Sequence, residues 1–132
     1  MRLSKSFELG LAIILIVARQ PDNSAIPATR IANQLQSSLT YSQKLLRKLV
    51  IAGLIKATPG NNGGFILTKS PTDITLADIV TALDGNMSSY QPSGVVDVVS
   101  NSSNLVASQA FHTADLVWYQ VLSQTSLASL LY

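Results

Sequence analysis

Apolar and polar positions along the chain predict a mainly helical fold. The first apolar run, residues 9–18, is apolar on almost every side, so we expect a helix over residues 3–19 at the centre of a domain. Two shorter segments, 28–36 and 40–52, carry apolar residues at intervals of three and four, which is typical of amphipathic helices. Gly53 ends the second of these helices.

A tight turn over residues 37–39 joins the two short helices. Thr40 and Gln43 have the spacing of a capping box, in which the two side chains satisfy backbone N–H groups at a helix start. Two short helices joined in this way, the second one basic, indicate a helix-turn-helix. Any pair of antiparallel helices in a small bundle has the same local pattern.

The residues after Gly53 separate these two interpretations. Residues 54–58 and 65–68 read as two strands, and the Gly- and Asn-rich residues 59–64 read as the loop between them. A hairpin directly after the second helix is the wing of a winged helix-turn-helix. Its glycines suit close approach to another backbone.

The second half of the chain predicts one short helix and one long helix. Thr75 caps the short helix, residues 76–83. Residues 86–103 are rich in serine and predict a loop, within which 95–99 are ambiguous between strand and helix. Asn104 caps the long helix, which runs from Leu105 to about Gln124.

The long helix has an apolar face too broad for a small domain to cover, which predicts a homodimer. The residues assigned to this interface are Ala107, Ala110, Phe111, Ala114, Val117, Trp118 and Val121. The expected fold is mainly α with a small β-hairpin. It divides into a winged helix-turn-helix domain (1–85), a flexible linker (86–103) and a dimerisation helix with a C-terminal tail (104–132).

Composition removes several classes of site. The chain has no cysteine, which excludes disulfides, thiolate metal sites and thiol nucleophiles, and it has one histidine, His112. We therefore expect no cofactor and no metal. One histidine and scattered acids supply no catalytic set, and the Gly-rich loop lacks the Lys-Ser/Thr of a phosphate loop, so we do not expect an enzyme.

The N-terminal apolar run has some features of a signal peptide, but three observations oppose that reading. Glu8 lies at the edge of the run, Ile16 is too bulky for a good cleavage site, and the chain lacks the disulfides usual in small secreted domains. The run is also shorter than the ~20 residues that span a membrane. We expect a cytoplasmic protein without membrane contact.

Charge is divided unevenly along the chain. Residues 1–70 hold nine basic and two acidic residues, a formal charge of +7, whereas residues 71–132 hold five acids and no base, a charge of −5. Such a division suggests a half that faces a polyanion and a half with another role.

The basic half supplies candidates for contact with double-stranded DNA. Phosphate contacts need cations and N–H donors, and base readout needs short polar side chains near the start of a recognition helix. The candidates are Arg2, Lys5, Ser38, Thr40, Tyr41, Gln43, Lys44, Arg47, Lys48, Asn61 and Asn62.

Several candidates have an ordinary structural alternative. Gln43 suits an adenine edge, but the capping box would use the same side chain. Lys44, Arg47 and Lys48 recur at helical spacing and can share one face, which also fits the solvated side of an ordinary helix. Turn chemistry explains Asn61 and Asn62 equally well.

The chain resembles the bacterial winged-helix regulators typified by the iron–sulfur cluster regulator (IscR) and the cysteine-metabolism repressor (CymR). The matching segments are Met1–Ser4, the wing Gly60-x2-Gly63-Gly64-Phe65-x-Leu67, the stretch from Pro71 to Gly85 and the ending 125–130. The resemblance implies a homodimer with crossed C-terminal helices that binds a pseudo-palindromic operator and usually represses.

Two departures from the family's pattern stand out. The stretch at about 90–105, where cluster-binding members carry three cysteines, has none here, and the fourth ligand position falls near Ser108. We therefore expect a member without a cluster. Pro59 takes the place of the wing arginine that many members insert into the minor groove.

Two function classes follow from the sequence. The first is a sequence-specific DNA-binding regulator, expected to repress, with an unknown small-molecule effector bound between the wing and the long helix as one option. The second is a winged-helix module that binds a protein and no longer reads DNA, which the departure at Pro59 favours.

Overall fold

The computed structural model describes residues 2–86 and 88–131, and Met1, Met87 and Tyr132 lie outside the described residues. The first elements are α1 (Phe7–Ala18), the 3₁₀ turn η1 (Pro21–Asn23), α2 (Ala28–Leu35), α3 (Leu39–Ile51), β1 (Ile55–Thr58) and β2 (Gly64–Leu67). They are followed by η2 (Pro71–Asp73), α4 (Leu76–Asp84), α5 (Val95–Val99), α6 (Asn101–Ser123) and η3 (Leu127–Leu130).

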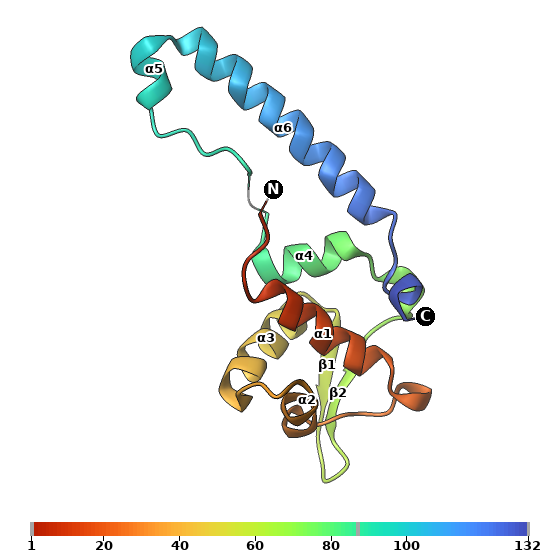
Figure 1. Cartoon of the computed structure of the whole chain (residues 1–132). Coiled ribbons are helices and arrows are strands. Elements are labelled where there is room, and N and C mark those ends of the chain that lie inside the picture. Colours follow the sequence, from red (N-terminus) through yellow and green to blue (C-terminus); the bar gives the residue numbers. More distant parts are fainter. Residues whose placement is uncertain (1, 87, 132) are drawn as a thin grey trace.

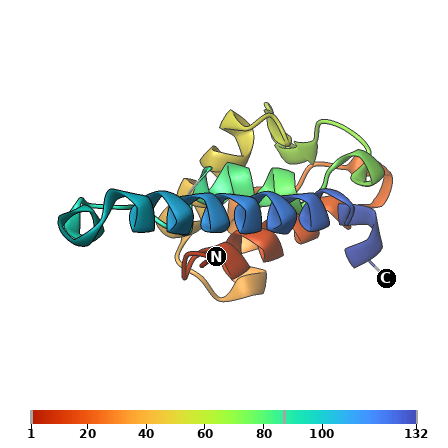
Figure 2. The ribbon, with the colours of Figure 1, turned by 90° about the horizontal axis from the view of Figure 1, so that it is seen from above.

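The elements form a body and a projecting helix (Figure 1). Helices α1 to α4 and the antiparallel hairpin make the body, which we call the wing domain (residues 2–86). Helix α6 runs above α4 and continues past the body to α5, as the view from above also shows (Figure 2). We call residues 88–123 the arm and residues 124–131 the tail. The mainly helical fold with one hairpin agrees with the sequence prediction.

The core of the wing domain is made by one side of each of its four helices and the inner residues of the hairpin. Helix α1 contributes Ile13, Ile14 and Val17, all fully buried, and so lies at the centre as predicted. A Cβ at Gly10 would lie 2.5 Å from Cδ1 of Leu83, so the missing side chain lets α1 approach α4 closely. The other large side chains that are fully buried are Ile26, Ile31, Leu45, Leu46, Leu49, Ile55, Ile74, Ile79 and Leu127.

The wing is anchored to the segment that precedes α2. Phe65 N donates to the carbonyl of Ile26 at 2.9 Å, and Ile26 N donates back to the carbonyl of Phe65 at 3.2 Å. A Cβ at Gly64 would collide with the backbone of Ile26, and one at Gly63 would collide with the carbonyl of Thr58. These two glycines therefore serve close approach within the chain itself.

The tail returns to the wing domain after the arm. Leu76 N donates to the carbonyl of Thr125 at 2.9 Å, and Leu127 N donates to that of Ile74 at 2.7 Å. Leu127 is fully buried in the core. The C-terminal end of α6 is thereby fixed to the start of α4.

The segment between α4 and α5 is fastened along α6. Ser89 N donates to Oδ2 of Asp115 at 3.2 Å. The rings of Tyr90 and Phe111 stack with their centroids 5.1 Å apart, and the Tyr90 hydroxyl donates to Oδ1 of Asn104 at 2.9 Å. Part of the arm thus holds itself together without help from the wing domain.

Two sequence predictions about the helices are wrong in detail. Helix α1 begins at Phe7, so residues 3–6 precede it. Helix α6 begins at Asn101 with Ser100 as its N-cap, ahead of the predicted cap at Asn104. Residues 95–99, which the sequence left open between strand and helix, are a helix, so much of the stretch 86–103 is helical. The division into three regions stays a prediction.

The capping box at Thr40 and Gln43 is also wrong. Ser38 is the N-cap of α3, and its hydroxyl accepts a hydrogen bond from Tyr41 N at 3.1 Å. The hydroxyls of Ser37 and Ser42 lie 2.6 Å apart and form a hydrogen bond. This bond ties the turn before α3 to the first turns of the helix. The cap predicted at Thr75 is confirmed, and Asp78 completes a capping box with it.

Candidate nucleic-acid interface

Helix α3 separates its apolar and polar residues cleanly. Ser42, Leu45, Leu46 and Leu49 are buried against the other helices. At 100° per residue, the exposed residues Thr40, Gln43, Lys44 and Arg47 lie within about 100° of one another on the opposite side. We call these four the open face of α3.

The position of the N-cap decides what Gln43 is available for. Because Ser38 caps the helix, Gln43 is the fifth residue of α3 and is exposed to solvent. The structural alternative considered for this side chain is therefore removed. Ser38, in turn, is exposed and has a structural role as the cap at the helix start.

Two of the predicted α3 residues lie at the edge of the open face. Tyr41 and Lys48 are about 100–120° round the helix from Arg47 and about 40–60° from Lys44. Lys48 is only partly exposed, and its Nζ donates to the carbonyl of Leu83 at 3.1 Å, at the end of α4. Lys44, Arg47 and Lys48 thus lie within about 100° of one another, and Lys48 differs from the other two in its contact with the end of α4.

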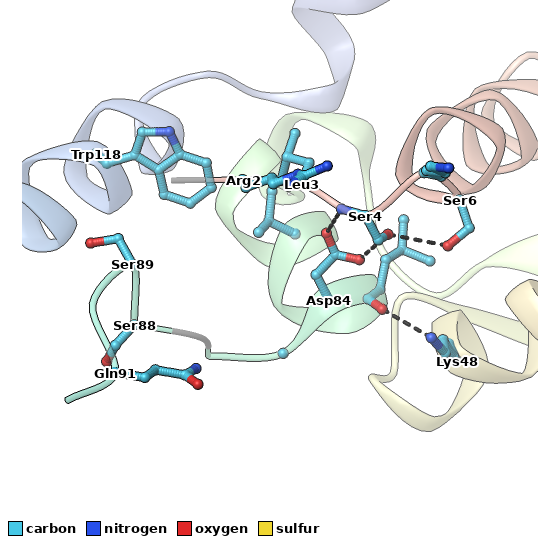
Figure 3. A pocket seen from close by; sticks show the side chains of 14 residues that line it. Arg2, Leu3, Ser4, Ser6, Lys48, Asp84, Ser88, Ser89, Gln91 and Trp118 are labelled. Carbon is cyan, nitrogen blue, oxygen red and sulfur yellow. Dashed lines mark hydrogen bonds between the residues drawn. The ribbon is translucent and has the colours of Figure 1, made fainter. Parts of the chain in front are cut away.

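Arg2 and Lys5 join Lys48 rather than the open face. Both belong to the segment before α1, where Ser4 is tied to α4 through Asp84. Together with Lys48 they line a cavity between that segment, the end of α4 and α6 (Figure 3). The predicted cations thus fall into two groups, one on the open face and one around this cavity.

The wing carries the remaining candidates at its tip. Asn61 and Asn62 are exposed in the turn closed by a hydrogen bond of 3.0 Å from Gly63 N to the carbonyl of Gly60. Pro59 is exposed next to them. Nothing in the wing domain covers the Asn side chains, which agrees with either a turn role or a contact with a partner.

The residues predicted for dimerisation separate into two sets on α6. Ala110, Ala114, Val117 and Val121 are exposed and lie within about 60° of one another, and we call them the α6 stripe. Trp118 lies about 100° round the helix from Val117, is partly buried and packs against the core of its own chain. Phe111 stacks on Tyr90 while remaining 46% exposed, and Ala107 is partly buried.

Comparison with known proteins identifies the group to which this fold and these surfaces belong. The model of the Rrf2 family, described as an iron-dependent transcriptional regulator, matches residues 3–132. The chain is a member of the Rrf2 family. The resemblance seen in the sequence is thereby confirmed, and the chain is a helix-turn-helix type of transcriptional regulator.

Two curated relatives of this Rrf2 protein are similar over most of their length. The putative regulator YffB of Lactococcus lactis is 34% identical over 97% of this chain and 85% of its own. The putative regulator YwgB of Bacillus subtilis is 33% identical over 96% of this chain and 82% of its own. Both are named as transcriptional regulators.

A solved structure confirms the fold. CymR, the global cysteine regulator of B. subtilis, superposes with a TM-score of 0.75 at 24% identity, covering 99% of this chain and 96% of its own. At this identity the match shows the winged-helix fold alone. Within the described part of this Rrf2 protein, no helix is long and apolar enough to cross a membrane.

The donor atoms of this Rrf2 protein do not fit the iron named in the family's description. The chain has no cysteine, and its one histidine, His112, is exposed on α6. Among residues 2–86 and 88–131, no three His, Cys, Asp or Glu side chains gather as a group that could hold a metal ion. We therefore assign no iron ligands in this chain.

Proposed function

We propose that this Rrf2 protein is a cytoplasmic repressor that binds a pseudo-palindromic operator as a homodimer and works without an iron–sulfur cluster. The observation that carries the proposal is the open face of α3. Gln43, Lys44 and Arg47 lie exposed together on it, and none of the three is used for packing or capping. A helix that enters the major groove needs such a surface beside a wing.

The groups on the open face have complementary roles. The amide of Gln43 presents a donor and an acceptor that match N7 and N6 of adenine, so this side chain would read sequence. Lys44 and Arg47 would contact phosphates, which supplies affinity that depends on salt and not on sequence. Asn61 and Asn62 at the wing tip would approach the neighbouring backbone.

The α6 stripe supports the homodimer. It is apolar and exposed, with Val117 at 54% and Val121 at 58%, and the small Ala110 and Ala114 allow a second helix to come close. A second copy related by a two-fold axis would place two α3 helices on one operator, which explains the expected palindrome.

Fluorescence anisotropy with duplexes from the region upstream of the protein's own gene tests the proposal. The full chain should bind one duplex more tightly than a scrambled duplex, and its affinity should fall steeply between two salt concentrations. Lys44→Ala should weaken binding to all sequences and lower the salt slope by about 1. Gln43→Ala should instead lose about 1–3 kcal/mol of discrimination at one position in each half-site.

Gln34→Ala is the matched control, because Gln34 is exposed on α2, outside the open face. It should keep the discrimination of the parent protein. Equal binding to specific and scrambled duplexes, with no salt dependence, would contradict the proposal. A stoichiometric protein partner recovered without nucleic acid would then support the alternative of a protein-binding module, which Pro59 in place of the wing arginine favours.

A further inference from the structure

A cavity of about 750 Å³ lies between the wing domain and the arm (Figure 3). Its walls come from the segment before α1, the end of α4, the residues that follow α4, and α6. Sites for small organic molecules have volumes of about 300–1,000 Å³, so this cavity is large enough for one. It lies apart from the open face of α3 but includes Lys48 from the same helix.

The cavity has an apolar wall. Trp118 lines it from α6, and Leu3, Val80 and Leu83 complete this surface. In Figure 3, Trp118 and Ser89 lie on one side of the cavity, and Asp84 and Lys48 lie on the other. An apolar body of a ligand would therefore rest on the indole ring.

The polar wall is cationic. Arg2, Lys5 and Lys48 line the cavity, and Asp84 is the one acidic residue in its lining. The Asp84 carboxylate is already engaged, since Oδ2 accepts from Ser4 N at 2.8 Å and Oδ1 accepts from the Ser4 hydroxyl at 2.5 Å. Lys48 Nζ uses one of its three donors on the carbonyl of Leu83, which leaves two for a ligand.

We infer that this cavity binds a small organic carboxylate whose apolar body lies on Trp118 and whose charge is held by Arg2 and Lys48. The lining holds three cations and one carboxylate, so its excess of positive charge attracts an anionic ligand. Hydroxyl groups of Ser88 and Ser89 and the amide of Gln91 would hydrogen-bond to other polar atoms of the ligand.

Binding would act on α3, an inference that rests on the proposed function. Lys48 joins α3 to the end of α4, and Ser4 joins the segment before α1 to the same end. A carboxylate that recruits Lys48 and Arg2 changes both connections. It also neutralises cations that would otherwise attract DNA phosphates, so the ligand should weaken operator binding.

Intrinsic fluorescence provides the test, because Trp118 is the only tryptophan in the chain. The probes are 4-phenylbutyrate, 4-phenylbutanamide and 4-phenylbutylamine, which share one apolar body and differ in the charge of the head group. We expect the carboxylate to change Trp118 emission saturably, the amide to bind at least about tenfold more weakly, and the amine not to bind. Equal responses to all three, or none to the carboxylate, would overturn the inference.

Variants then locate the carboxylate. Lys48→Met and Arg2→Gln should each weaken 4-phenylbutyrate binding about tenfold or more, because each removes a charged hydrogen bond. Arg2 is exposed in the segment before α1, so its replacement tests the site even if Lys48→Met disturbs folding. Lys56→Met, on the exposed side of β1 and outside the cavity, is the control and should bind as the parent does. Unchanged binding in both cavity variants would overturn the inference.

The DNA measurement separates this inference from the proposed function. With 4-phenylbutyrate present, the Kd for the operator should rise about fivefold or more, and the amide should leave it unchanged. A fluorescence response with an unchanged operator Kd would overturn the regulatory part. If the chain binds no operator at all, the proposed function fails, while the fluorescence titration still decides whether the cavity binds carboxylates.

Discussion

The wing domain and the arm use the same kinds of apolar residues in opposite ways. Every helix of the wing domain buries residues such as Ile13 and Leu49, both 0% exposed. Helices α5 and α6 have no buried residue, and Val98 on α5 is 87% exposed. Apolar surface that stays in contact with water is unfavourable by about 25 cal/mol per Å². The wing domain, together with Leu127 of the tail, thus covers its apolar residues, whereas the arm leaves apolar surface uncovered, which supports the proposed homodimer.

The connections between the two regions reinforce this difference. The arm is fixed at one end by Trp118 and by the tail, where Leu127 is buried in the core. At its other end it depends on the stack of Tyr90 on Phe111. An isolated helix is marginal in water, so most of the stability of α6 in its outer half should come from a second copy.

A core substitution should produce the largest difference between the two regions in the free energy of unfolding. Ile13→Ala removes a fully buried side chain and leaves a cavity, so we expect the free energy of unfolding to fall by about 2–5 kcal/mol. Val98→Ala, at an exposed position of α5, should change it by no more than about 0.5 kcal/mol. Urea unfolding followed by circular dichroism, at one fixed protein concentration, measures both. Similar losses in the two variants would mean that the arm is as well packed as the core.

The α6 stripe should respond to charge in a way that the rest of α6 does not. Val117→Glu would place a carboxylate in the proposed dimer interface, where burial without a partner is costly. We expect the dimer to dissociate at least about 30-fold more readily, which is ~2 kcal/mol. Light scattering across a dilution series measures the change in mass.

His112→Glu is the matched control for this charge. His112 is exposed on the same helix, about 140° round from Val117. This variant should keep the mass of the parent protein. A monomeric parent, or equal dissociation of both variants, would show that the stripe is not the interface between copies.

Local sequence patterns predicted the wing domain well, because its signals are short in range. The hairpin after α3 and the capping box at Thr75 each depend on residues within a few positions of one another. The cap of α3 was misplaced, since Ser38 and Thr40 are both suitable caps and the choice depends on the bond between Ser37 and Ser42. The spacing of apolar residues does not indicate that these two hydroxyls are bonded to each other.

The errors in the arm and the cavity come from contacts between distant residues. Asn104 has the composition of an N-cap, but its side chain accepts from Tyr90, and Ser100 caps α6 instead. Lys48 is 35 positions from Leu83, whose carbonyl it contacts. The periodicity of α6 predicts a broad apolar face but does not show which of its residues pack on the core. Trp118 does so, whereas Val117 is exposed.

The smallest difference in stability between the two regions is expected from their helix caps. Thr75 Oγ1 accepts from Asp78 N at 3.1 Å at the start of α4, beside the buried Ile74 and Ala77. Ser100 Oγ accepts from Ser103 N at 3.2 Å at the exposed start of α6. Thr75→Ala should cost about 1 kcal/mol and lower Tm by about 3–5 °C, because the freed N–H is partly buried in a cooperative unit.

Ser100→Ala removes the same kind of hydrogen bond from the arm. Water can reach the freed N–H of Ser103, so Tm should fall by less than about 1 °C. Amide exchange at Ser103 should nevertheless become faster, because the first turn of α6 can open without unfolding the wing domain. Thermal melts and hydrogen exchange on both variants measure this contrast. An equal loss of Tm in the two would show that the arm unfolds together with the wing domain, and the tail and the Trp118 contact would then couple the regions along the whole of α6.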